Sequence, residues 1–321
     1  MATVSHNSEL LFLYDAKQCN PNGDMDNENK PRMDWEAGRN LVSDVRLKRY
    51  IRDYLMKVQE HPIFVRKLGD EALKAKEALA LYKLTHLDGK KEIALSKKDL
   101  NLKEKELKSI GDDIFGLVDI RLFGATIPIE VEEGQGSSST FTGPVQFNWG
   151  YSLNTIHELQ ESKTITSHLQ TGKSEHGAGI GKDYRVNYSF LAFSGGINAN
   201  VAQDTRMTEE DAQLLDEAII KSIPLNRTRS KIGQTPRLYL RVEMIDNQTV
   251  LNDLREFIHL EASVPEPELR SIQECAIDAT DLQNYLDKFD GKIQRIHYWK
   301  DENLNINGLD LTSAKFQKLS Y

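Results

Sequence analysis

The sequence predicts an α+β protein whose core has the order of strands and helices found in ferredoxin-like folds. Apolar runs and helical periodicities follow one another as strand, helix, two strand regions, helix and strand, the split βαβ order that RNA-recognition modules share. A lysine- and glutamate-rich stretch and a polar, glycine-containing stretch interrupt that order. The expected fold is therefore a modified ferredoxin-like core with a helical insertion and an arm-like insertion.

The first elements are a strand, a polar loop and an amphipathic helix. Residues 9–14 (ELLFLY) form an apolar run typical of a buried strand. Residues 19–31 are rich in Asn, Asp, Gly and Pro, which suit turns and bond to nearby backbone, so an exposed loop is expected. At about 3.6 residues per turn the next segment places two sets on opposite helix faces, an apolar set of Leu47, Ile51, Tyr54, Leu55 and Val58 and a basic set of Arg39, Arg46 and Arg49.

The two insertions and the later elements follow from composition and alternation. Residues 61–111 read as charged amphipathic helices separated by Asp88-Gly89. Residues 119–125 and 144–153 are expected strands around a Gly/Ser loop, and the polar residues 155–183 are an expected projecting arm. The remaining expected elements are a strand at 184–193, a capped helix at 208–220, a strand at 236–245, helices near 253–259 and 279–289, and a strand at 292–299.

Composition limits the function without choosing it. A net charge of -8 over 321 residues argues against a surface that binds polyanions everywhere, so nucleic-acid binding would need a local basic stripe. No apolar run approaches the about 20 residues of a membrane helix, and the N-terminus lacks a signal-peptide layout, so a cytoplasmic protein is expected. Cys19 and Cys275 lie far apart, which predicts packing residues rather than a zinc ribbon or a disulfide framework.

Five segments carry a resemblance to a known family: NPNGDMDNENKPRMD, GRNLVSDVRLKRYIRDYL, DIRLFGATIP, TGPVQFNWGYSLN and SFLAFSGGIN. They resemble the backbone subunit of Cascade, the type I CRISPR interference complex, in the Cas-seven family of subtype I-B and the wider RAMP superfamily. The resemblance implies a right-hand shape, a palm related to RNA-recognition modules with helical fingers and a thumb. It also implies polymerisation along CRISPR RNA, each thumb folding over its neighbour and displacing one guide base.

That family role defines the expected domains and partners. The partners are CRISPR RNA, target DNA paired with the guide, further copies of this chain and other Cascade subunits; no catalytic residue, metal or cofactor is expected. The domains are a first part of the palm at 1–58, helical fingers at 59–116, palm strands with a flexible loop at 117–154, a thumb-like arm at 155–184, and palm completion with bracing elements at 185–321.

A protein that holds a guide of any sequence must contact phosphate and sugar, for which Arg, Lys, Ser, Asn and backbone amides are suited. An arginine face on a surface helix is more often merely solvated, but with the family resemblance we favour binding. The predicted RNA-binding residues are Asn20, Asn22, Gly23, Arg32, Arg39, Asn40, Ser43, Arg46, Arg49, Phe147, Lys182, Arg185, Arg229 and Lys231.

Three of these predictions compete with plainer explanations. The run GAGIGKDYR at 177–185 ends like a phosphate loop, but His176 and Asp183 replace required residues, so Lys182 and Arg185 either touch RNA or belong to a simple hinge. Phe147 and Trp149 alternate with polar residues and could stack bases, although aromatic residues at period two are more often core. In the stretch 228–237, Arg229, Lys231 and Arg237 could form a second phosphate contact, although a solvated loop is the default explanation.

Two other functions remain open. Asp24, Asp26 or Asp34 could hold magnesium for RNA cleavage, since related type III backbone subunits cut target RNA with an aspartate in the corresponding loop. An EF-hand is excluded, because Trp35 stands where its terminal glutamate is needed. Alternatively, the charged helices could bind proteins, making the chain an interaction scaffold with an incidental basic face.

Overall fold

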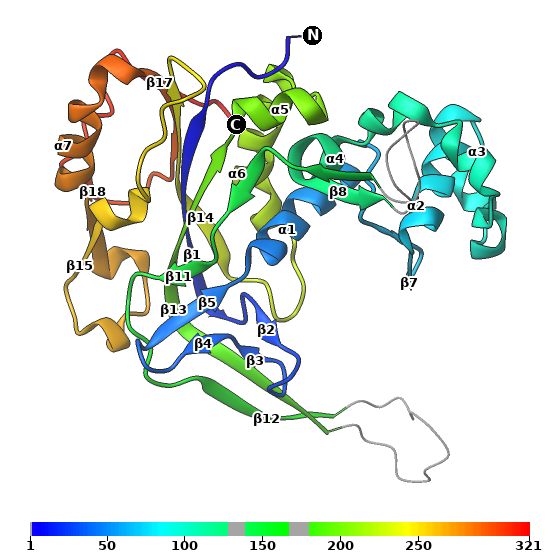
Figure 1. Cartoon of the computed structure of the whole chain (residues 1–321). Coiled ribbons are helices and arrows are strands. Elements are labelled where there is room, and N and C mark those ends of the chain that lie inside the picture. Colours follow the sequence, from blue (N-terminus) through cyan, green and yellow to red (C-terminus); the bar gives the residue numbers. More distant parts are fainter. Residues whose placement is uncertain (1, 128–138, 167–179) are drawn as a thin grey trace.

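The computed structural model describes residues 2–127, 139–166 and 180–321 of the chain, without the side chains of 162–166 and 180–181. Ten strands of the described part form the main sheet in the order β19-β17-β14-β1-β13-β11-β5-β4, with β10 and β12 also paired to β13 (Figure 1). Their bounds are Ser8–Cys19 (β1), Met33–Asp34 (β4), Arg39–Val42 (β5), Val145–Phe147 (β10), Gly150–Ser152 (β11), Gln160–Thr166 (β12), Ile180–Ile197 (β13), Gln234–Met244 (β14), Ile293–Lys300 (β17) and Phe316–Lys318 (β19).

Strand β1 is the centre of the sheet. It pairs antiparallel with β13 on one side and β14 on the other, and β13 pairs antiparallel with β11. Leu10, Phe12 and Tyr14 enter one core, while Leu11 and Leu13 enter another, as side chains alternate along a strand. Because both faces are covered, the run is apolar throughout instead of alternating with polar residues. The prediction of a buried strand at 9–14 is confirmed.

Helices cover one face of the sheet. They are α1 (Asp44–Lys57), α4 (Val118–Phe123), α5 (Ala199–Thr205) and α6 (Glu209–Leu225). The apolar side of α1 is buried in this core with α6, as the periodicity predicts, except that Val58 lies at the C-terminal cap and is exposed. Thr208 caps α6 by accepting a hydrogen bond from the Asp211 amide, which confirms the predicted start of this helix.

The C-terminal part of the chain covers the other face. It comprises α7 (Thr280–Lys288) and a three-stranded sheet of β15 (His259–Ala262), β16 (Cys275–Asp278) and β18 (Ile306–Asn307). Its apolar side chains share a core with Leu11 and Leu13. Cys19 and Cys275 are both free and buried, as predicted for packing residues.

A helical lobe with its own core stands beside the main body (Figure 1). It contains α2 (Ala75–Tyr82), a π-helical turn at Lys83–Leu87, α3 (Glu104–Lys108), the hairpin of β6 (Lys67–Leu68) and β7 (Glu71–Ala72), and the hairpin of β8 (Gly124–Ile127) and β9 (Ser139–Thr142). The buried carboxylate of Asp119 accepts hydrogen bonds from Arg52 Nε (2.9 Å) and the Phe64 amide (2.7 Å), which joins the lobe to α1. The helices predicted for 61–111 are present but short.

An arm extends from the end of the sheet that lies lowest in Figure 1. It consists of β12 and the part of β13 that pairs with it, from Gln160↔Arg185 to Thr166↔Ile180 (Figure 1). The strand predicted at 184–193 is therefore the middle of one 18-residue strand. The remaining residues of the predicted arm, 167–179, lie outside the described residues.

Three predicted elements are wrong. Arg39 and Asn40 lie in β5 instead of the basic helix, because 39–42 pairs with β4 and β11 and Ser43 caps α1. Residues 118–123 are the helix α4, and only 124–127 form a strand, since α4 packs its apolar side against the main core. The helix predicted near 253–259 is a 3₁₀ turn at Leu254–Phe257 followed by β15.

Glu9 on β1 gives a prediction about stability. Glu9 lines a pocket of about 310 Å³ together with apolar residues such as Ile197 and Val250 and polar residues such as Asn7 and Gln146, and burial raises its pKa to about 7. The folded state therefore loses stability as pH rises from the unfolded pKa near 4.5 through 7. We expect Glu9→Gln to raise the free energy of unfolding by about 2 kcal/mol at pH 8, a value discounted for partial exposure, and hardly at all at pH 4.5.

Urea unfolding at the two pH values measures this difference, with Glu302→Gln at an exposed turn as the control. An equal gain at both pH values would show that ionisation of Glu9 does not contribute to the change in stability.

No helix in the described ranges is long and apolar enough to cross a membrane.

Candidate nucleic-acid interface

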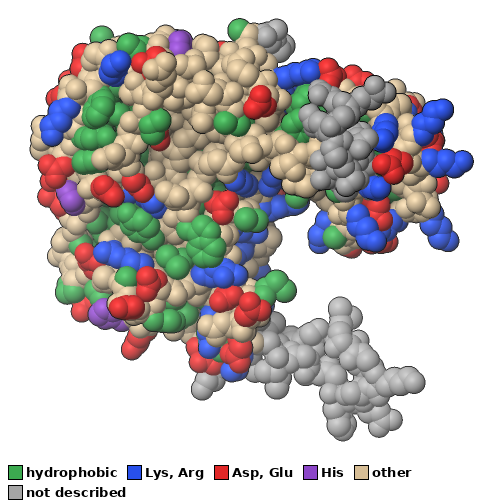
Figure 2. Space-filling view, viewed as in Figure 1, with side chains coloured by type: hydrophobic (Ala, Val, Ile, Leu, Met, Phe, Trp, Pro, Cys, Tyr) green, Lys and Arg blue, Asp and Glu red, His purple; other side chains and the backbone are tan. Residues whose placement is uncertain are grey.

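Three segments distant in sequence meet where the polar loop joins α1. The space-filling view shows a hollow between the helical lobe and the lower part of the sheet, with Lys and Arg side chains along part of its wall (Figure 2). The Asn20 amide donates to the Ser230 carbonyl (2.9 Å), and Lys231 Nζ donates to the carbonyls of Asn20 (2.5 Å) and Pro21 (3.2 Å). The loop before β14 is thus fastened to the end of β1. Gly233 (φ +104) permits this contact, since a Cβ there would lie 2.3 Å from the Lys17 carbonyl oxygen.

The polar loop also holds the first turn of α1. Asn22 Oδ1 accepts hydrogen bonds from both the amide and the hydroxyl of Ser43 (2.9 Å each), and Ser43 Oγ accepts from the Arg46 amide (3.3 Å). Serine is a preferred N-cap because its oxygen satisfies an amide that the helix leaves unpaired. Asn22, Ser43 and Arg46 therefore form one connected unit.

Arg46 and Lys231, which we call the cationic pair, are basic side chains that lack an acidic partner. In the described part of the chain no carboxylate lies within the 4.0 Å ion-pair distance of either one. The Arg46 guanidinium lies 4.1 Å from the centroid of the Tyr50 ring, and its Nε is buried without a hydrogen bond. Lys231 bonds only to carbonyl oxygens, which leaves one of its three N–H donors unused.

The charges of this pair act on each other. Burial, and next the positive charge of Arg46, lower the pKa of Lys231 from 10.5 to about 8. An anion placed between them would favour the charged lysine and give the unused donors a partner. The arrangement is therefore suited to a phosphate group.

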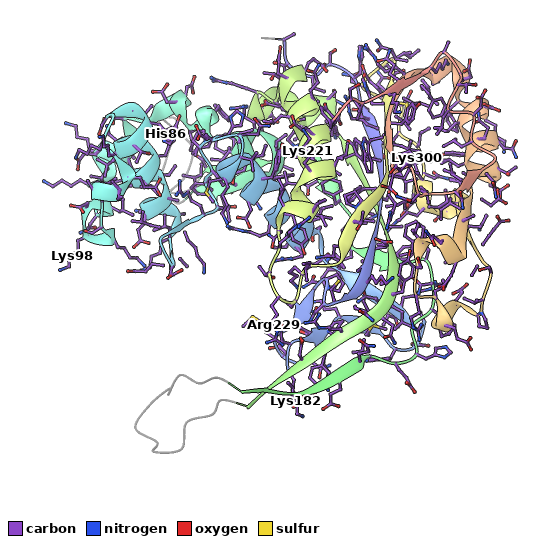
Figure 3. The ribbon with its side chains drawn as sticks, turned by 180° about the vertical axis from the view of Figure 1, so that it is seen from behind. His86, Lys98, Lys182, Lys221, Arg229 and Lys300 are labelled. Carbon is purple, nitrogen blue, oxygen red and sulfur yellow. The ribbon has the colours of Figure 1, made fainter. Side chains whose placement is uncertain are left out.

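Arg185 and Arg229 meet at the base of the arm but are neutralised there. Asp183 Oδ2 accepts from Arg185 Nε and from Arg229 Nη2, both at 2.9 Å. Burial alone would raise the pKa of Asp183, but the hydrogen bonds from the two arginines outweigh it and lower the pKa. Figure 3 shows Arg229 near the start of the arm, with Lys182 farther along it.

Asp24 and Glu28 of the polar loop, and Asp34 after it, have partners within the chain. Glu28 accepts from the Tyr184 hydroxyl (2.7 Å) and pairs with Lys182 (3.5 Å), which docks the loop on β13. Asp24 pairs with Arg32 at 3.2 Å, and Asp34 Oδ1 accepts from the amides of residues 36 and 37. Within the described ranges, no three His, Cys, Asp or Glu side chains gather as a metal site would need.

Several predicted contacts are engaged in holding the fold. Arg39 donates to the carbonyls of Ser152 and Leu153 in the β11 segment. Asn40 is fully buried, accepts from Ser189 Oγ and donates to the Arg32 carbonyl. Arg49 pairs with Asp53 at 2.5 Å, four residues later on α1.

Asn20 and Gly23 lie inside the polar loop. Asn20 is buried, donates to the Asn29 carbonyl (2.7 Å) and has an Oδ1 without a partner. Gly23 belongs to the small hairpin of β2 (Gly23–Asp24) and β3 (Lys30–Pro31), where a Cβ would lie 1.9 Å from Asn29 Oδ1. Both residues therefore shape the loop, and Asn20 keeps one free acceptor.

The two aromatic residues of the β10 segment differ in their exposure to solvent. Phe147 is only 8% exposed and packs in the main core, so its ring has no open face for a base. Trp149 is 46% exposed and lies in the short connection between β10, which ends at Phe147, and β11. Our choice of Phe147 is thus unsupported, and the residue with an accessible ring is Trp149. Alternation in the sequence predicts the same face for both and gives no signal for where the strand ends.

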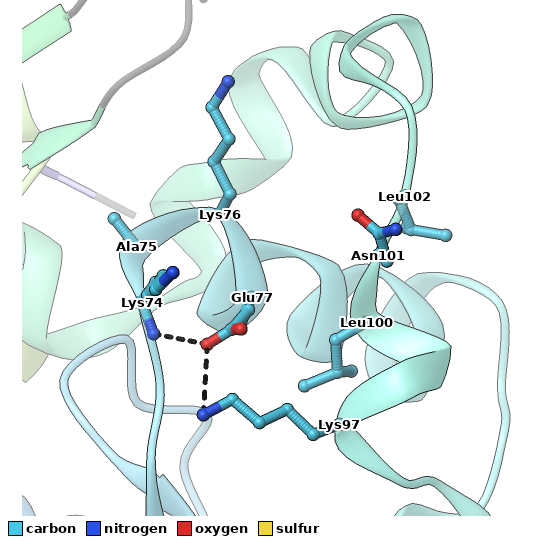
Figure 4. Close-up of a pocket in the computed structure, with 8 residues that line it drawn as sticks. All are labelled: Lys74, Ala75, Lys76, Glu77, Lys97, Leu100, Asn101 and Leu102. Carbon is cyan, nitrogen blue, oxygen red and sulfur yellow. Dashed lines mark hydrogen bonds and ion pairs between the residues drawn. The ribbon is translucent and has the colours of Figure 1, made fainter.

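A pocket of about 450 Å³ on the helical lobe is separate from this interface (Figure 4). Its only carboxylate, Glu77, accepts from the Lys74 amide (2.7 Å) and lies 3.9 Å from Lys97 Nζ. The pocket is lined by Lys74, Ala75, Lys76, Glu77, Lys97, Leu100, Asn101 and Leu102. No buried polar group points into it without a partner among the described residues.

Comparisons with known proteins connect the whole chain to one family. The family model "CRISPR-associated protein Cas7" matches residues 6–280. The Haloferax volcanii protein named CRISPR-associated protein Cas7 is 30% identical over 322 residues, covering 95% of this chain and 90% of that protein. A chain in a solved structure titled "CRISPR RNA-guided surveillance complex, pre-nicking" has a similar fold, with a TM-score of 0.54 at 14% identity over 98% of this chain and 96% of that chain.

Proposed function

The chain belongs to the CRISPR-associated protein Cas7 family, and from this premise we propose that it binds CRISPR RNA along the RNA backbone, whatever the guide sequence. It acts as the repeating backbone subunit of a Cascade-type surveillance complex of subtype I-B in the cytoplasm. Its partners are the guide, further copies of itself, the other Cascade subunits and target DNA paired with the guide. Its role is to hold and present the guide, without cutting nucleic acid.

The observation that carries this proposal is the cationic pair. Phosphate is common to every nucleotide, so a site for phosphate binds RNA independently of its sequence. Arg46 and Lys231 lack an acidic partner among the described residues. Burial, with the nearby charge of Arg46, lowers the pKa of Lys231 to about 8, and a bound anion would raise it. In this proposal Arg185 and Arg229 contribute less to phosphate binding, because Asp183 offsets part of their charge.

We assign the parts of the hand in the same way. The antiparallel order β14-β1-β13-β11, with α1 and α6 on one face, supports a ferredoxin-like palm. The helical lobe supports fingers at 59–116, and the ladder of β12 with β13 supports a thumb at 155–184. In this assignment Asp24 and Asp34 have structural roles, through Arg32 and through the turn after β4.

A binding measurement tests the proposal. The purified chain is expected to bind single-stranded RNAs of unrelated sequence with similar affinity, and log Kobs should fall linearly with log salt concentration. Filter binding over a range of salt concentrations provides the data. Salt-insensitive binding, or no binding at all, would contradict the proposal.

The titration of Lys231 adds a second prediction. Because its pKa is about 8 without RNA and phosphate raises it, wild-type binding must take up a proton above pH 8, so affinity should fall as pH rises. We expect a loss of up to about tenfold from pH 7 to pH 9, since one pKa unit corresponds to a factor of ten. Lys231→Arg is the matched control, because a guanidinium stays charged throughout this range. Equal losses in the two proteins would argue against a titrating lysine at the phosphate site.

A further inference from the structure

We propose that Trp149 is a stacking platform for one nucleobase of the bound RNA, with Arg32 fixing the position of the indole ring. This inference rests on the proposed RNA-binding function and adds a contact to a base face. The Arg32 guanidinium lies 5.9 Å from the centroid of the Trp149 ring, and Asp24 pairs with Arg32 at 3.2 Å. A cation near one side of the ring and a large exposed remainder leave aromatic surface open to a flat partner.

The backbone of Trp149 is held on both sides. The Asn148 amide donates to the Ser194 carbonyl (2.9 Å), and the Trp149 carbonyl accepts from Arg255 Nη1 (2.8 Å). Arg255 is itself buried, bonds to both carboxylate oxygens of Asp253 and lies over the ring of Tyr151 (4.5 Å). Because the backbone of Trp149 is fixed by these hydrogen bonds, its exposed indole loses little conformational entropy when a ligand binds.

The platform lies next to the phosphate site. Gly150 on β11 pairs with Val42 on β5 in an antiparallel ladder. Trp149, just before Gly150, and the helix cap Ser43, just after Val42, therefore lie next to each other at the end of this ladder. Asn22 connects Arg32 to the start of α1, since its carbonyl accepts a hydrogen bond from the Arg32 amide (3.0 Å) and its side chain accepts one from the Ser43 amide. A nucleotide whose phosphate sits at the cationic pair therefore has an aromatic surface within the same loop-and-helix unit.

A nucleobase is the occupant that these observations favour. Every base has a π face, so stacking strengthens binding while tolerating any sequence, as a guide-holding protein requires. Trp35 is also exposed, but it lies in the turn after β4, and no Lys or Arg of the described residues lies over its ring. It therefore serves as a matched control of the same residue type.

The experiment compares two oligonucleotides with the same number of phosphates, a single-stranded RNA and its abasic analogue, by fluorescence anisotropy at fixed salt. Wild-type protein should prefer the RNA that carries bases. Trp149→Ala should reduce that preference by about tenfold, within the range measured for base–aromatic stacking, while Trp149→Phe and Trp35→Ala retain most of it. In the variant W35F/W299F, the emission of Trp149 should be quenched by RNA and not by the abasic analogue.

The possible failures are distinguishable. If Trp149→Ala keeps the wild-type preference for bases while RNA still binds with salt-sensitive affinity, the platform is wrong and the phosphate site stands. If RNA affinity is unchanged but Trp149→Ala no longer assembles with other copies, the indole is a protein contact and the inference also fails. If wild-type protein binds neither oligonucleotide, both the platform and the proposed function fail.

Discussion

Replacing Arg46 and Lys231 together by glutamine is expected to weaken RNA binding by about hundredfold, equally for all sequences. A hydrogen bond to a charged group contributes about 1.5–3 kcal/mol, and about 1.4 kcal/mol corresponds to a factor of ten. The two side chains have no competing carboxylate among the described residues, so no anion of the protein has to be displaced by phosphate. The slope of log Kobs against log salt should also fall by about 0.7, since a single strand loses roughly 0.7 per phosphate contact and the pair holds one phosphate.

The matched control removes two lysines from elsewhere. Lys288 on α7 and Lys318 on β19 are exposed and belong to the C-terminal part of the chain, so K288Q/K318Q changes the net charge by the same amount. Thermal unfolding of both double variants verifies that each remains folded. If the two variants weaken RNA binding to the same extent, the effect is one of net charge and the cationic pair has no special role.

Asp216→Asn is expected to lower the free energy of unfolding by about 3–5 kcal/mol, the usual cost of leaving one member of a buried ion pair uncompensated. Asp216 lies on α6 and is fully buried. Its carboxylate accepts hydrogen bonds from Arg241 Nε (2.8 Å), Arg241 Nη2 (2.7 Å) and the Tyr239 hydroxyl (2.7 Å) on β14. Asparagine keeps the size of the side chain but leaves the buried Arg241 with Glu243, 3.5 Å from its Nη1, as its remaining counter-charge.

Urea unfolding at pH 7 measures the loss, and Asp112→Asn is the control. Asp112 pairs with Arg206 at the same 2.7 Å but is 62% exposed, so solvent screening makes this pair worth little. A loss of stability below about 1 kcal/mol for Asp216→Asn would show that the buried pair is dispensable. Because the pair ties α6 to the main sheet, RNA binding measured well below the unfolding transition should be unchanged.

Some assignments at the interface were predictable from local sequence alone. Ser43 as the cap of α1, the apolar face of that helix and the buried run of β1 all depend on residues close in the chain. Local sequence also contained a signal that we did not use. Arg49 and Asp53 are four residues apart on a helix, the spacing at which opposite charges pair.

Other assignments depended on contacts between distant segments. Asp183 offsets the charge of Arg229, 46 residues later in the chain, and nothing in either local sequence indicates that pair. The burial of Phe147 and the exposure of Trp149 follow from where β10 ends against β13, which alternation does not reveal. Asn40 is buried by Ser189, Ser152 and Arg32 from three other segments.

The sequence by itself determined the family, the position of the central strand and first helix, and the kinds of side chain that we propose contact RNA. The strand and the helix follow from local composition and periodicity, and the family follows from the resemblance of five segments. The chain carries all of these features in any conformation. Only the tertiary structure decided which cations keep their charge available, because an ion pair depends on distances between residues far apart in the chain. The same long-range packing selected Trp149 over Phe147 as the accessible ring and placed Lys231 beside Arg46.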